Sequence, residues 1–142
     1  GLRVGVAEYD EGPTGATVFH FEKPVLAAVD VRGGAPATIN TDALRLSYDV
    51  PFVNAVAFAG GSSYGLAVAT GAADEIKARI ANPTQWENIA TVVGAILFDV
   101  GGRRLSQVTP DYELGRSALR AAQPGRFPQG ARDAGGFAMQ VG

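Results

Sequence analysis

Short apolar stretches separated by turn residues dominate the first part of the chain. Leu2–Tyr9, Gly15–Phe21 and Val25–Val31 are rich in aliphatic, β-branched and aromatic residues, with Gly, Pro and charged residues between them. This alternation predicts three strands in a hairpin-like succession, with turns at DEGPTG and at Glu22–Pro24. Residues 32–51 are polar and contain Pro and Gly, and they predict a long loop.

The pattern then changes to strand followed by helix. Phe52–Ala59 predicts a buried strand, and the segment from Tyr64 to Ile80 predicts a helix that the Asn82-Pro83 pair ends. The apolar stripe expected for this helix is Leu66, Ala69, Ala73, Ile76 and Ile80. Its charged residues, including the Asp74-Glu75 pair, are expected to face water.

A second strand and helix follow. ATVVGAILFDVGG, residues 90–102, is apolar on both faces and predicts a central strand of a covered sheet. TPDYELGRSALRAA, residues 109–122, predicts a helix with Thr109 as its N-cap, Pro110 in the first turn and two acids near the positive end of the dipole. Residues 126–142 return to glycine-rich turn and strand character.

Composition narrows the class of protein. The 142 residues correspond to one domain, and 46% hydrophobic with 18% charged residues indicates a globular chain. A net charge of −2 provides no basic field for nucleic acid, and no apolar run approaches the roughly 18 residues of a membrane span. The absence of cysteine excludes disulfides and thiolate metal sites and is consistent with the cytoplasm.

Gly61-Ser62-Ser63-Tyr64-Gly65 matches the G-x-S-x-G pattern of a nucleophile elbow. A serine hydrolase using Ser63 would need a base, and the only histidine, His20, lies in an apolar strand where histidine is more often structural. We therefore favour Ser62 and Ser63 as a helix N-cap, with backbone N–H groups free to bind an anion or a developing oxyanion. Ser63 as nucleophile stays open as the alternative.

The chain lacks a complete catalytic set. One histidine, no cysteine and no carboxylates at ligand spacing give no metal site, and no phosphate-binding glycine motif occurs. The last residues, GGFAMQVG, resemble the middle of a structural element. We expect Gly1–Gly142 to be a single-domain fragment whose core and chemistry are completed by other residues.

Six segments in the same order resemble the DmpA-like hydrolases. They are GPTGATVFHF, AAVDVRGGAPATINTDAL, VNAVAFAGGSSYGLAVATGAADEI, VVGAILFDVGG, PDYELGRSAL and PGRFPQG. The family covers the L-aminopeptidase/D-Ala-esterase, the β-peptidyl aminopeptidases and the nylon-oligomer endohydrolases. EGPTGATVFHF and PGRFPQG look most like the nylon-oligomer branch.

The resemblance implies an α/β (α+β) fold, a four-layer α-β-β-α sandwich similar to that of N-terminal-nucleophile hydrolases. It implies a precursor that cuts itself into α and β chains and assembles as a tetramer of αβ units. The new N-terminal Thr or Ser of the β chain is the nucleophile, and its own amine can act as base. This chain would be the N-terminal part of the α segment, with its partners being the remainder of that segment and the β chain.

The resemblance places no catalytic residue in this chain. The nucleophile, a Lys and an oxyanion-binding Asn are expected after Gly142, and the chemistry requires no cofactor or metal. Some members carry an active-site Tyr where this sequence has Phe98, and Phe cannot donate a hydrogen bond. Phe98, Gly60, Gly61, Ser62 and Ser63 are the candidate residues of the substrate cleft, with a purely core role for Phe98 as the alternative.

The leading hypothesis is an amide hydrolase acting on linear amides, either 6-aminohexanoate (nylon) oligomers or short peptides with a free amine. An aminopeptidase or β-aminopeptidase of the same family is one alternative. A stand-alone serine hydrolase and a non-catalytic scaffold of the same fold are the others.

Overall fold

The computed structural model describes residues 1–11, 14–45, 51–81, 85–99 and 107–125. The five strands are β1 (Leu2–Tyr9), β2 (Thr14–Leu26), β3 (Thr38–Ile39), β4 (Phe52–Ala59) and β5 (Val92–Ile96). The α-helices are α1 (Ala67–Arg79) and α2 (Tyr112–Arg120), and three short 3-10 helices are η1 (Thr41–Leu44), η2 (Ser62–Leu66) and η3 (Trp86–Asn88). The expected turn and strand character of residues 126–142 lies outside the described residues.

All five strands belong to one mixed sheet with the order β1-β2-β4-β5-β3. β1 pairs with β2, β2 with β4 and β3 with β5 in antiparallel fashion, whereas β4 and β5 are parallel. A parallel pair requires a crossover connection, and α1 provides it. The predicted strand–helix–strand succession over residues 52–96 is thereby confirmed.

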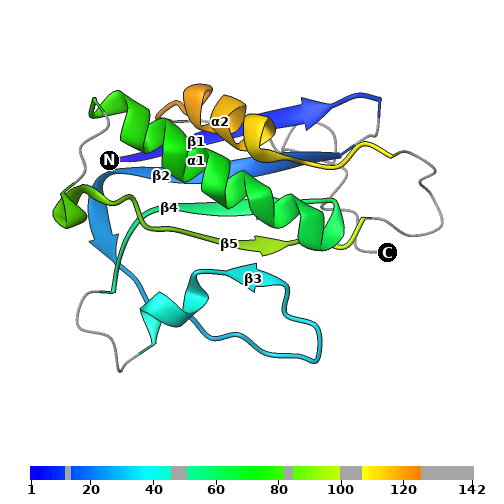
Figure 1. Ribbon diagram of the computed structural model, residues 1–142, viewed down its shortest axis with the longest axis horizontal. Coiled ribbons are helices and arrows are strands. Elements are labelled where there is room, and N and C mark those ends of the chain that lie inside the picture. Colours follow the sequence, from blue (N-terminus) through cyan, green and yellow to red (C-terminus); the bar gives the residue numbers. More distant parts are fainter. Residues whose placement is uncertain (12–13, 46–50, 82–84, 100–106, 126–142) are drawn as a thin grey trace.

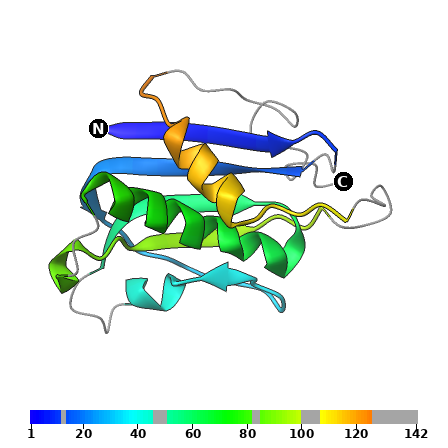
Figure 2. The ribbon, with the colours of Figure 1, turned by 45° about the horizontal axis from the view of Figure 1, so that its top comes forward.

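Both helices cover the same face of the sheet (Figure 1). Figure 2 shows α1 running along β4 and β5 while α2 crosses β1 and β2. The core between the layers consists of small and medium side chains, among them Val18, Ala57, Val68, Ala118 and Leu119. These small residues bring the layers close together.

The two helices approach each other at backbone distance. A Cβ atom added at Gly115 of α2 would collide with the backbone oxygen of Val68 in α1. Glycine is required there because any side chain would push the helices apart. The helix layer is therefore a tightly joined pair.

The opposite face of the sheet is also apolar. Leu44, Val53 and Val93 form a second buried cluster there. Phe19 and Phe58 stack edge to face with their ring centroids 6.1 Å apart. The described residues thus supply one α layer and one β layer of the expected α-β-β-α sandwich, with an apolar sheet face beyond them.

Three predictions for the first part of the chain differ from the structure: the turn at residues 22–24, the strand at residues 25–31 and the loop at residues 32–51. β2 continues through Glu22, Lys23 and Pro24 to Leu26, so these residues do not form the expected turn, and no strand spans Val25–Val31. The register between β2 and β4 shifts between His20 and Val25, and this irregularity accommodates the proline. The predicted loop over residues 32–51 contains β3 and η1. β5 lies between β4 and the two-residue β3, next to the sheet edge.

The helices also differ from expectation at their ends. The predicted helix from Tyr64 divides into η2 and α1, and Ile80, assigned to the apolar stripe, is exposed. The N-cap of α2 is Asp111, whose carboxylate accepts a hydrogen bond from the Leu114 N–H at 2.9 Å, and not Thr109. Pro110 therefore precedes the helix. Within the described ranges, neither helix is long and apolar enough to cross a membrane.

Candidate functional site

The candidate cleft residues gather at the carboxyl ends of β4 and β5. Because these strands are parallel and in register, Ala59 pairs with Ile96 and the segments that follow them start at the same edge of the sheet. Gly60 and Gly61 follow β4, and Phe98 and Asp99 follow β5. In open α/β sheets this edge is where ligands bind.

Asp99 joins three segments at this edge, and sequence analysis did not single it out. Its Oδ1 accepts a hydrogen bond from the Gly61 backbone N–H at 2.6 Å, and its Oδ2 accepts one from Thr14 Oγ1 at 2.8 Å. Thr14 begins β2 and is 1% exposed. One carboxylate therefore connects the start of β2, the turn after β4 and the end of β5 (Figure 1 labels the three strands).

The Gly60-Gly61 turn has the shape that this carboxylate requires. A Cβ atom added at Gly60 would collide with Asp99 Oδ2 and would lie 2.6 Å from Thr14 Oγ1. Gly61 has φ of +81°, a left-handed conformation that favours glycine. The two glycines permit the close contact between turn and carboxylate.

The structure corrects the N-cap expected from Ser62 and Ser63. Both lie inside η2, whose N-cap is Gly61, and neither η2 nor α1 has a side-chain cap hydrogen bond. The Gly61 N–H is also not free for an external anion, because Asp99 occupies it. The carboxylate of Asp99 thus binds the backbone N–H that the sequence predicts to be available for an anion.

The structure does not assemble a Ser63–His20 pair. His20 pairs with Ala55 in the sheet, whereas Ser63 follows Ala59 at the far end of β4. Four residues of strand separate Ala55 from Ala59, which corresponds to roughly 13 Å. Ser63 is exposed and has no histidine beside it among the described residues.

Phe98 is 68% exposed in the described chain, and both of its expected roles, in the cleft and in the core, stay predictions for the full-length protein. It lies beside Asp99 at the edge where β4 and β5 end, with Gly60 and Gly61 close by in the fold. Its phenyl ring can offer an apolar surface and no hydrogen-bond donor. Its contact with substrate stays a prediction.

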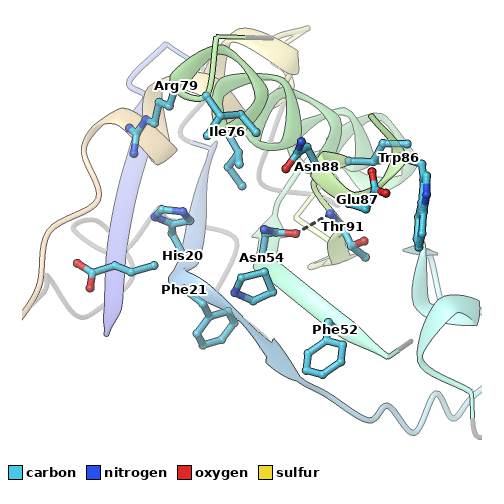
Figure 3. A pocket seen from close by; sticks show the side chains of 14 residues that line it. His20, Phe21, Phe52, Asn54, Ile76, Arg79, Trp86, Glu87, Asn88 and Thr91 are labelled. Carbon is cyan, nitrogen blue, oxygen red and sulfur yellow. Dashed lines mark hydrogen bonds between the residues drawn. The ribbon is translucent and has the colours of Figure 1, made fainter. Parts of the chain in front are cut away.

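A cavity of about 540 Å³ lies at the opposite end of the sheet, where α1 ends and β4 begins. Figure 3 shows His20 and Asn54 on one side of it and Trp86 on the other. Asn54 Oδ1 accepts a hydrogen bond from the Thr91 N–H at 2.8 Å and so joins β4 to the segment before β5. The walls include large exposed side chains, with Trp86 72% and Ile89 69% exposed.

His20 is a half-buried, uncharged residue of this cavity. Burial lowers its pKa below 6.5, the positive charges of Arg79 and Arg3 lower it further, and Glu22 opposes them. Its Nδ1 atom is buried and has no hydrogen-bond partner within the part of the chain that the structure describes. The predicted strand position of His20 is confirmed.

Glu75 was expected to face water, and this prediction was wrong. It is 8% exposed, and its Oε2 accepts hydrogen bonds from Arg120 Nε at 2.9 Å and from Arg116 Nε at 3.3 Å. Burial raises the pKa of Glu75, but the hydrogen bonds from Arg120 and Arg116 and the charges of Arg120 and Arg79 outweigh it and lower the pKa overall. The signal in the sequence was the spacing of four residues between Arg116 and Arg120, which puts both on one helix face.

Among the described residues, no group of three or more His, Asp or Glu side chains is placed to hold a metal ion. The described chemistry of the edge where β4 and β5 end thus consists of an internally bonded carboxylate, a glycine turn and an exposed phenyl ring. These groups can shape a substrate site and orient its walls.

Comparison with known proteins identifies the family. The model of peptidase family S58 matches residues 1–142. The 6-aminohexanoate-oligomer endohydrolase of Paenarthrobacter ureafaciens is 41% identical over 135 residues, which cover 95% of this chain and 36% of that protein. The protein of the same name from Kocuria sp. strain KY2 is 42% identical over 135 residues, with the same coverage of 95% and 36%.

Proteins named aminopeptidases match as well, over a smaller share of the chain or at lower identity. An uncharacterized aminopeptidase of Mycobacterium tuberculosis is 39% identical over 111 residues, covering 76% of this chain and 31% of that protein. A Burkholderia sp. beta-aminopeptidase structure superposes with a TM-score of 0.67 at 20% identity and covers 92% of this chain and 38% of that chain. The structural likeness confirms the predicted fold class. The chain spans little more than a third of the length of the relatives it matches.

Proposed function

The chain belongs to peptidase family S58, and on that basis we propose that it forms part of an amide hydrolase acting on linear amides, with 6-aminohexanoate oligomers as the substrate class. The observation that carries this proposal is the 41% identity, across 95% of the chain, to an endohydrolase of that name. The DmpA-like resemblance of the six motifs supports the same conclusion.

The catalytic groups of this reaction are proposed to lie outside the chain. An N-terminal Thr or Ser, freed by self-cleavage, attacks the amide carbonyl while its own amine takes the proton. The absence of a histidine beside Ser63 among the described residues is consistent with a nucleophile supplied from elsewhere. A Lys and an Asn, also outside the chain, complete the proposed set.

This chain would then supply part of the substrate cleft. An oligomer of 6-aminohexanoate alternates amides with runs of methylene groups, and methylene groups are stabilised against apolar surface. The exposed ring of Phe98 beside the Gly60-Gly61 turn offers such a surface. Phe98 therefore contributes to binding the apolar spacer and not to the proton transfers.

An aminopeptidase of the same family is the second candidate. The 39% identity to an uncharacterized aminopeptidase of Mycobacterium tuberculosis favours it. The two candidates differ in the substrate end they require, because an aminopeptidase needs a free amine next to the scissile amide and an endohydrolase does not.

The proposed assembly consists of two chains cut from one precursor, with four such αβ units per particle, in the cytoplasm. The apolar sheet face opposite the helices supports a further layer of the same protein packing there. The cysteine-free sequence is consistent with the proposed compartment.

The test uses the full-length protein. Mass spectrometry of the purified product is expected to show two chains, the second beginning with Thr or Ser, and the processed protein is expected to hydrolyse 6-aminohexanoate oligomers. A parallel assay with amine-blocked oligomers separates the two candidates, since only an endohydrolase accepts them. An uncut polypeptide with full amidase activity would contradict the self-processing mechanism.

A further inference from the structure

The Asp99 side chain is hydrogen-bonded to two segments that are distant from it in the chain. Its two carboxylate oxygens are divided between a backbone N–H of the turn after β4 and a buried hydroxyl at the start of β2. Hydrogen bonds to an ionised acceptor are short and roughly twice as strong as neutral ones. We propose that Asp99 is a positioning residue that fixes Phe98 and the Gly60-Gly61 turn in the geometry of the substrate cleft. The proposal rests on the proposed amide hydrolase function.

The backbone next to Asp99 links its carboxylate to the cleft wall. The Leu97 N–H donates to the Ala59 carbonyl oxygen at 2.8 Å, so the β4–β5 pairing continues up to the residue before Phe98. Beyond it, the Asp99 side chain is bonded to the turn while the Phe98 ring remains exposed. Phe98 is thus held on both sides, by the strand before it and by the carboxylate after it.

Thr14 fixes the other oxygen of the carboxylate. Its hydroxyl is buried and donates to Asp99 Oδ2, and its backbone belongs to β2. Valine would fill nearly the same volume without the hydroxyl, leaving a part-buried carboxylate oxygen short of one donor. The pair therefore depends on the hydroxyl and not on the shape of the side chain.

The arrangement also determines which groups can bind a developing oxyanion. The Gly61 N–H points at a carboxylate, and a second negative charge beside Asp99 would be repelled. Gly61 is consequently excluded as an oxyanion donor. Asp99 then acts on the geometry of the cleft wall and not on the charge of the transition state.

The experiment compares four variants of the full-length protein. Asp99→Asn keeps the shape of the side chain and removes its charge, Thr14→Val removes the donor, and Thr14→Ser keeps it. Asp30→Asn, at an exposed carboxylate in the loop after β2, is the matched control. Because the misplaced wall weakens substrate binding, we expect Asp99→Asn and Thr14→Val to raise KM about tenfold with kcat within about twofold. Thr14→Ser and Asp30→Asn are expected to match the wild type.

A double-mutant cycle shows whether Asp99 acts through Phe98. Phe98→Ala is expected to raise KM strongly in the wild type and only slightly in the Asp99→Asn background, because the ring is already misplaced there. Additive effects on KM would overturn the proposal. A lowered thermal midpoint for Asp99→Asn with unchanged KM would also overturn it, since the carboxylate would then be only a structural support.

Amide hydrogen exchange tests the positioning role of Asp99 independently of the amidase activity. In Asp99→Asn, exchange in peptides covering residues 60–66 and 96–99 is expected to be about tenfold faster, with β1 unchanged. Faster exchange in a protein whose wild type hydrolyses no linear amide would support the positioning role and contradict the proposed function. Unchanged exchange and unchanged KM in an active enzyme would contradict the positioning role alone.

Discussion

The two ends of the β4–β5 pair are built differently. At the carboxyl end the polar groups bond to one another, and glycines bring the backbone close to the carboxylate of Asp99. At the amino end a cavity opens under the end of α1, with a half-buried histidine and the exposed ring of Trp86 on its walls (Figure 3). We therefore expect substitutions at the carboxyl end to destabilise the protein more than substitutions at the amino end.

The two ends of the β4–β5 pair differ in the burial and hydrogen bonding of their side chains more than in residue type. Both contain an aromatic side chain that is largely exposed, Phe98 at one end and Trp86 at the other. Phe98 is the neighbour of a carboxylate that bonds to Thr14 and Gly61, which are distant in the chain, whereas η3, which contains Trp86, has a local side-chain hydrogen bond from Asn88 to Gln85. Substitutions at the two ends should therefore differ in cost, and the following variants of the full-length protein test that difference.

The largest effect is expected for Gly60→Ala. The new methyl group would displace Asp99 Oδ2 and Thr14 Oγ1, and overpacking of this kind costs up to about 3 kcal/mol. We expect the free energy of unfolding in urea to fall by about that amount and the amidase activity to be lost. Gly34→Ala is the matched control, because a Cβ atom there meets nothing within 4 Å. Equal, small decreases in the free energy of unfolding of both variants would show that the Gly60-Gly61 turn can accommodate a methyl group, and would contradict this prediction.

Glu75→Gln tests the helix layer above the cavity, since Arg79 both pairs with Glu75 and lines the cavity. Removing the charge leaves several arginines without their shared partner, and we expect a loss of about 2 kcal/mol, between the values for exposed and buried ion pairs. Glu113→Gln is the control, because that carboxylate is 64% exposed and lies 3.8 Å from Arg116. It is expected to change the unfolding free energy by less than about 0.5 kcal/mol.

The lowered pKa of Glu75 adds a pH dependence to this prediction. The folded state holds the carboxylate ionised at pH values where the unfolded chain is already protonated. Its stabilisation is therefore complete above pH 4.5 and is lost as the pH falls through the folded pKa. Acid titration of unfolding should show a shallower decline for Glu75→Gln than for the wild type, and parallel curves would contradict the assignment.

His20→Gln tests the open end at milder pH. Burial and the charges of Arg79 and Arg3 lower the folded pKa of His20, with Glu22 in opposition. The stability associated with the neutral ring is fully present above pH 6.5 and is lost as the pH falls through the lowered pKa. We expect the wild type to lose stability below pH 6.5 more steeply than His20→Gln. The difference is smaller than for Glu75, because His20 is half-buried whereas Glu75 is 8% exposed. A steeper loss of stability in His20→Gln than in the wild type would contradict this prediction.

The sequence predicted the elements better than their junctions. The apolar runs at Phe52–Ala59 and Val92–Ile96 marked real strands because both runs are rich in β-branched and other apolar residues. The turn expected at Glu22–Pro24 failed because tertiary pairing with β4 resumes after an irregularity that no local pattern reveals. Asp111 as N-cap was missed because Thr109 is an equally good capping residue by type, and only the chain path decides between them.

For the candidate site, the sequence selected residues that the structure places at the ends of two neighbouring strands, and it missed the interaction that joins these ends. Gly60, Gly61 and Phe98 were identified by their position in the motifs. Asp99 was not, because its partners Thr14 and Gly61 lie 85 and 38 residues away in the chain. Contacts of such separation depend on the sheet order, which periodicity alone cannot supply.

The smallest effect is expected for Trp86→Ala. An exposed side chain makes few contacts, so we expect the free energy of unfolding to change by less than about 0.5 kcal/mol. Leu119→Ala, at a fully buried position of α2, is the contrasting variant and should cost about 3 kcal/mol. If Trp86→Ala were as costly as Leu119→Ala, the rest of the full-length protein would have to pack over Trp86. The cavity would then be closed in the assembled enzyme, and the two ends of the sheet would differ in which residues cover them and not in whether they are covered.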